Sequence, residues 1–216
     1  MPETLEEKLN AIEARDEQLR QYFLDAMKAD PTLYIADFVI YGALKRTLAL
    51  SDGFRRHIRE RNFTCAGALL RLQLDTAIRL YASKLHRNPF VYADAIFRGN
   101  PVNKLKDRRG NKMTDSYLAA KMSREFPWVK SMYEELCDFI HFSNRHIFAA
   151  FTSVSPADAD GRAVQIMIGS KDPPRPDSDY FEVVDGYLET MRVTLLLAAR
   201  WHAAIHRPDN RAPTTT

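Results

Sequence analysis

The residues best suited to chemistry lie in one stretch, 133–151 (YEELCDFIHFSNRHIFAAF), where polar side chains are mixed with large apolar ones. Its two histidines and its arginine are His141, His146 and Arg145. A neutral histidine can take a proton from an RNA 2′-hydroxyl, and an arginine can stabilise the charge that develops on the phosphate. His141, Arg145 and His146 are therefore the candidate catalytic residues of a phosphodiester-cleaving enzyme that needs no metal ion.

A metal site is the second chemistry that the histidines suggest. Asp138 and His141 are three residues apart, a spacing found in carboxylate–histidine metal sites, but the pair needs further ligands. His202 and His206 are four apart and share one helix face, yet they occupy a last helical turn, where cationic side chains are favoured by the helix dipole. We therefore expect a structural role for His202 and His206, no metal site and no cofactor.

A row of charges on the helix expected over residues 63–86 must be positioned by the fold. Arg71, Asp75 and Arg79 follow one another at intervals of four and stack along this helix, which is apolar on both flanks. The row is an internal ladder, a solvated surface row or the lining of a binding pocket. We expect Arg71, Asp75 and His141 to form one buried polar cluster, because a buried charge needs partners.

Helical periodicity dominates the rest of the chain. Thr4 and Glu7 form a capping box that starts the first helix, and Asp30 followed by Pro31 predicts the start of the second. The helix that opens at Pro127 is expected to continue to His146, which would bring Cys137, His141 and Asn144 or Arg145 close to one face. From residue 147 to 169 the period changes to two, with a turn-rich segment at 156–161.

The predicted fold is therefore all-α, a bundle of six to seven helices with one β-hairpin inserted near 147–169. We expect one helical domain over residues 1–207 and a disordered tail over 208–216. A narrow heptad stripe on the first helix, together with a hairpin whose edges need cover, predicts a homodimer. The stripe consists of Leu5, Ile12, Leu19 and Ala26.

Composition adds weak limits on function. The 216-residue chain has a formal net charge of +3 and no dense run of lysine and arginine, so binding to RNA is possible but is not supported by charge. Two cysteines are too few for a disulfide framework, no leader is apparent, and no apolar run approaches the ~20 residues that span a bilayer. A cytoplasmic location without membrane contact is expected. The glycine loops that cradle nucleotide phosphates are missing.

Two segments together carry a resemblance to a known group of proteins. ALLRLQLDTAIRLYA (68–82), followed by YEELCDFIHFSNRH (133–146), resembles an uncharacterised family of helical bacterial proteins. In that family an Arg-x-x-x-(Asp/Glu) helix precedes a Tyr-x-x-Leu-(Cys/Ser)-x-x-x-His helix. The family is loosely grouped with HEPN-like domains, which include metal-independent toxin and antiphage RNases. The resemblance implies site roles for the matching residues Arg71, Asp75, Tyr133, His141 and Ser143.

The sequence leaves three functions open. The first is an interaction, structural or regulatory protein without catalysis. The second is a HEPN-like RNase, although Arg145 and His146 are adjacent here, whereas HEPN nucleases separate their arginine and histidine by several residues. The third is a small-ligand or nucleotide-binding protein that uses Arg71, Asp75, Arg79, Tyr133 and Ser143. An open pocket at His141 would favour catalysis or ligand binding, and a sealed core there would favour the first function.

Overall fold

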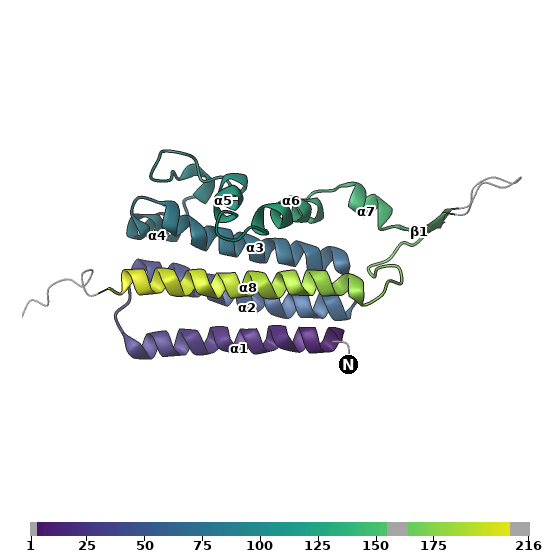
Figure 1. Cartoon of the computed structure of the whole chain (residues 1–216), viewed down its shortest axis with the longest axis horizontal. Helices are drawn as coiled ribbons and strands as arrows, with labels where there is room; N and C mark the ends of the chain where they lie inside the picture. The colour runs from purple at the N-terminus through teal and green to yellow at the C-terminus, as the bar shows by residue number, and fades with distance from the viewer. Residues whose placement is uncertain (1–3, 155–163, 208–216) are drawn as a thin grey trace, which may run out of the picture.

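Four long helices run side by side and form the body of the molecule (Figure 1). They are α1 (Leu5–Ala29), α2 (Ile35–Arg59), α3 (Phe63–Leu85) and α8 (Ser178–Ile205). The computed structural model describes residues 4–154 and 164–207. Within them, no helix has both the length and the apolar character needed to cross a membrane.

Shorter elements cover one side of α3 and then leave the bundle. These are α4 (Pro89–Phe97), the 3-10 turn η1 (Val102–Lys104), α5 (Asp115–Met122) and α6 (Val129–Ile140). The chain continues through α7 (Asn144–Phe148) into the antiparallel strands β1 (Phe151–Val154) and β2 (Val164–Ile166). Figure 1 shows α7 and β1 beyond the end of the long helices.

The all-α fold predicted from periodicity is confirmed, with two differences in detail. The described residues contain eight α-helices instead of six or seven, because a separate short helix, α7, occupies the start of the predicted hairpin. Ser143 caps α7, since the backbone N–H of Ser143 donates to Nδ1 of His146 at 3.2 Å. The hairpin is thereby confined to 151–166, while the expected turn at 156–161 and the tail at 208–216 lie outside the described residues.

The starts of the first two helices test the capping predictions. The Thr4–Glu7 capping box is present, with the Thr4 backbone N–H donating to a Glu7 carboxylate oxygen at 2.6 Å. The predicted start of the second helix is wrong. Asp30 ends α1, and α2 begins only at Ile35, because Asp37 accepts the Tyr34 backbone N–H at 2.8 Å and caps the helix there.

The heptad stripe of α1 faces the inside of the bundle. Leu5, Ile12, Leu19 and Ala26 are buried, and α1 packs against both α2 and α8. The stripe is therefore not an exposed surface for a second chain, and it cannot support the predicted homodimer. Between α2 and α8, the rings of Phe54 and Tyr187 stack with centroids 4.0 Å apart in the core.

Candidate functional site

The charged row of α3 forms a real network at the edge of the core. Asp75 accepts a hydrogen bond from Nε of Arg79 at 3.1 Å, and its other oxygen lies 3.4 Å from Nη1 of Arg46 on α2. The Asp75 side chain keeps 17% of its surface exposed, whereas Arg71 is almost fully buried. The row is thus an internal ladder at Arg71 that opens toward solvent near Asp75.

The partners of Arg71 come from α5 and α6. Its guanidinium lies over the ring of Tyr133, 4.4 Å from the ring centre, and 4.0 Å from a carboxylate oxygen of Asp115. The same carboxylate is paired with Arg79 at 2.7 Å. Burial raises the pKa of Tyr133, and the positive charge of Arg71 opposes that shift. This network holds the α5–α6 layer on α3, which is a structural task.

His141 does not belong to the network, so the prediction of a buried cluster of Arg71, Asp75 and His141 is wrong. The helix α6 ends at Ile140, and His141 follows as an exposed C-cap residue in extended conformation. The Phe139 ring packs on Gly67, one turn before Arg71 on α3. The end of the helix also separates His141 from Arg145, so the expected common face with Cys137 does not form.

The other predicted site residues lie around α7. Arg145 is exposed and its guanidinium stacks over the Phe139 ring at 4.4 Å. Ser143 donates from its hydroxyl to the carbonyl of Asp138 at 3.1 Å, which fixes the turn between α6 and α7. His146 is half-buried and lines a hollow of about 390 Å³ between the start of α3 and the segment 167–172.

The hydrogen bond at His146 restricts its chemistry. Because the Ser143 backbone N–H is the donor, Nδ1 of His146 must be the acceptor, and a neutral ring carries its proton on Nε2. Such a ring offers its Nε2–H as a proton donor and has no free ring lone pair to act as a general base. His146 alone therefore cannot take the proton that RNA cleavage requires while this cap is intact.

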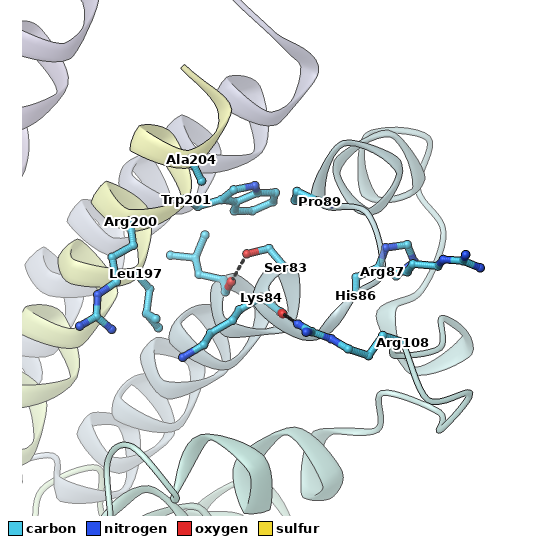
Figure 2. A pocket seen from close by; sticks show the side chains of 11 residues that line it. Ser83, Lys84, His86, Arg87, Pro89, Arg108, Leu197, Arg200, Trp201 and Ala204 are labelled. Atoms are coloured by element: carbon cyan, nitrogen blue, oxygen red, sulfur yellow. Dashed lines mark hydrogen bonds between the residues drawn. The ribbon is translucent and has the colours of Figure 1, made fainter. Parts of the chain in front are cut away.

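The hollow drawn in Figure 2 has a basic rim and an apolar wall. Its volume is about 410 Å³. It lies between the end of α3, the start of α4, the loop after η1 and the second half of α8. Lys84 and Arg200 on the rim both pair with Glu125, and Arg108 donates to the backbone carbonyl of Lys84. These three cations are already engaged within the protein.

Asp107 fixes the loop that carries Arg108 to this rim. Burial acts to raise the pKa of Asp107, but hydrogen bonds from the Tyr117 hydroxyl (2.6 Å) and from the backbone N–H groups of Asn111 and Arg109 outweigh it. The pKa is therefore held well below its usual range. The ionised carboxylate stabilises the fold above the unfolded-state pKa near ~4, and this stabilisation is lost as the pH falls below it.

We therefore expect Asp107→Asn to lower the free energy of unfolding at pH 7 by about 1–2 kcal/mol, the cost of weakening charge-assisted hydrogen bonds. The difference between wild type and variant should shrink as the pH is lowered below ~4, since the unfolded wild-type chain then binds a proton that the folded carboxylate does not take up. Urea unfolding at several pH values measures this. An equal loss in Asp52→Asn, at an exposed ion pair with Arg56, would contradict the assignment.

Sequence reasoning missed one chemical group entirely. Asp37, near the start of α2, lies against His202 and His206 of α8, and the potential ligand atoms of all three lie within 4.8 Å of one another. The spacing of the histidines was visible in the sequence. Asp37 stands 169 residues from His206, so no local pattern could have connected them.

A second missed feature is an apolar arm, which we define as residues 141–171. Its described part exposes a cluster of large apolar side chains, from 37% exposed at Phe151 to 89% at Ile168. The set is Phe142, Ile147, Phe148, Phe151, Val164, Ile166 and Ile168. The sequence predicted a hairpin whose edges need cover, but it did not show which large side chains stay exposed. In the structure these side chains are exposed.

Comparisons with family models, with curated proteins and with solved structures give no match for this chain.

Proposed function

We propose that this chain is a non-catalytic interaction protein that assembles with a second copy of itself through the apolar arm. The observation that carries this is the exposed apolar surface of the arm. Its seven large side chains, of roughly 150–200 Å² each, leave an area on the order of 700 Å² in water. That approaches the ~800 Å² that each partner contributes to an interface of standard size.

The hairpin gives a further reason for a second copy. A two-stranded sheet with strands of four and three residues is marginal by itself, and three or more strands give a more stable sheet. A two-fold axis brings identical edges and identical apolar patches together. Arg145 of α7 is turned back over Phe139, so its charge does not lie between the two patches.

The test is the oligomeric state of arm variants. We expect the wild-type chain to be dimeric in light scattering at tens of micromolar. Phe148→Glu or Ile168→Glu should each raise the dissociation constant by more than ~30-fold, because a charge replaces an anchoring apolar side chain worth ~2 kcal/mol. Phe97→Glu is the matched control, since Phe97 on α4 is 61% exposed and Phe148 is 66% exposed.

A monomeric wild-type chain at these concentrations would refute the proposal, and so would equal dissociation by Phe97→Glu. RNA cleavage by the wild-type chain that is lost in His141→Ala or His146→Ala, with the dimer intact, would replace it by the RNase hypothesis. Dimerisation itself is compatible with both, so the cleavage assay is needed beside light scattering.

A further inference from the structure

Three segments meet at the end of the bundle where α8 finishes: the end of α1, the first turn of α2 and the last turns of α8. They bring together Asp30, Asp37, His202 and His206. Nε2 of His206 lies 3.0 Å and 3.1 Å from the two carboxylate oxygens of Asp37, and its Nδ1 lies 3.2 Å from Asp30. Nε2 of His202 lies 3.7 Å from the same Asp37 carboxylate.

This group is withdrawn from water. Asp37 has no exposed surface, and the side chains of His206 and His202 are 9% and 14% exposed. The rings of Tyr22 and Tyr41 stand near His202, with centroids 6.2 Å and 6.4 Å away. Buried carboxylates are costly unless they are paired with cations or hydrogen-bond donors.

The protons available to His206 do not satisfy both of its neighbours when the ring is neutral. A neutral imidazole has one N–H and one lone pair, but each ring nitrogen of His206 faces a carboxylate. If Nδ1–H donates to Asp30, the lone pair of Nε2 points at the oxygens of Asp37. A positive charge between Nε2 and that carboxylate removes the repulsion.

His202 gives a second, separate indication that a ligand binds here. Its Nε2 is buried and has no hydrogen-bond partner among the described residues, although it lies 3.7 Å from a carboxylate oxygen of Asp37. The two imidazole rings are stacked, with centroids 4.2 Å apart and planes 24° from parallel. A protonated His206 would satisfy Asp30 and Asp37, but it would leave Nε2 of His202 without a function. A metal ion would be bound by Asp37, His202 and His206 together.

We propose that Asp37, His202 and His206 bind a divalent transition-metal ion of the zinc class, with Asp30 orienting His206 through its Nδ1–H. Two imidazole nitrogens and one carboxylate oxygen are a donor set that suits Zn²⁺, and three protein ligands leave one position open. The 3.0 Å and 3.7 Å separations between ligand atoms bracket the ~3.3 Å edge of a tetrahedron with Zn–N and Zn–O bonds of ~2.0–2.1 Å. A carboxylate behind a ligating histidine is the usual outer partner.

The experiment uses the full chain after removal of metal by a chelator. Titration calorimetry with Zn²⁺ should show one ion per chain, and saturating Zn²⁺ should raise the melting temperature. His202→Gln and Asp37→Asn should each weaken binding more than ~100-fold, because the loss of an outer partner alone costs about 10- to 100-fold. Asp30→Asn should fall within that smaller range. His57→Gln, near the opposite end of α2, should bind as the wild type does.

Substitution with Co²⁺ tests the ligands without any variant, so the test survives if a variant does not fold. The visible spectrum of the wild-type complex should show nitrogen and oxygen ligands. A thiolate charge-transfer band would place the ion on Cys65 or Cys137 and overturn the proposal. Wild-type binding no tighter than that of folded His202→Gln, or an equal loss in His57→Gln, would overturn it too.

Discussion

Replacing His206 with alanine should lower the free energy of unfolding of the metal-free chain by about 3–5 kcal/mol. The substitution removes the imidazole that stands between Asp30 and Asp37, and Asp37 has no exposed surface. Removing the partner of a buried carboxylate costs this much, because the remaining charge stays buried without compensation. The alanine also leaves a cavity against the Tyr34 ring, whose centre is 5.1 Å from that of His206.

Urea denaturation in the presence of a chelator measures this loss. His141→Ala is the matched control, since His141 is exposed and its removal should change stability by less than ~0.5 kcal/mol. Similar losses in the two variants would show that His206 does not bridge the aspartates. The result is independent of metal binding, because the stripped protein contains no ion in either variant.

Gly67→Ala should destabilise the chain by about 2–3 kcal/mol and loosen α6 from α3. A Cβ atom added at Gly67 would lie 2.3–2.6 Å from three ring atoms of Phe139, so the ring or the whole helix α6 must move. Overpacking of a tight core contact costs about 1–3 kcal/mol. Phe139 also supports Arg145 of the arm, so the damage should reach α7.

Thermal unfolding, together with amide hydrogen exchange in α6 and α7, tests the Gly67 prediction. Gly42→Ala on α2 is the control, because no atom of the described residues lies within 4 Å of a Cβ added there. Alanine at this helical position should be neutral or should stabilise the chain by up to ~1 kcal/mol. Faster exchange in α6 only for Gly67→Ala is expected, and equal behaviour of the two variants would contradict the close packing.

Sequence patterns correctly predicted the features that depend on residues close together in the chain. The capping box of Thr4 and Glu7 and the stacking of Asp75 with Arg79 both depend on residues three or four apart, and both are present. The partners of Arg71 could not be predicted, since Tyr133 and Asp115 reach it from other helices. For the same reason the contact of Asp37 with the two histidines of α8 could not be predicted.

The break between α6 and α7 was missed for a different reason. The stretch 133–146 contains no proline or glycine, so its helical period gave no sign of ending before His146. The signal was Ser143 followed three residues later by His146, a capping box with histidine in the place of the usual Glu or Gln. Recognising it would have placed His141 before a new helix and outside the core.

Both ends of the arm return to the same residue of the bundle. The Phe139 ring lies 5.7 Å from that of Phe63, and Asp172 accepts the Phe63 backbone N–H at 2.9 Å. The arm is therefore an insertion whose entry and exit are already closed by the body of the protein. Closing a loop costs entropy that grows only slowly with its length, so such a segment can lengthen, shorten or exchange its sequence at little cost to the bundle. Partner choice can thus evolve separately from the fold that carries it.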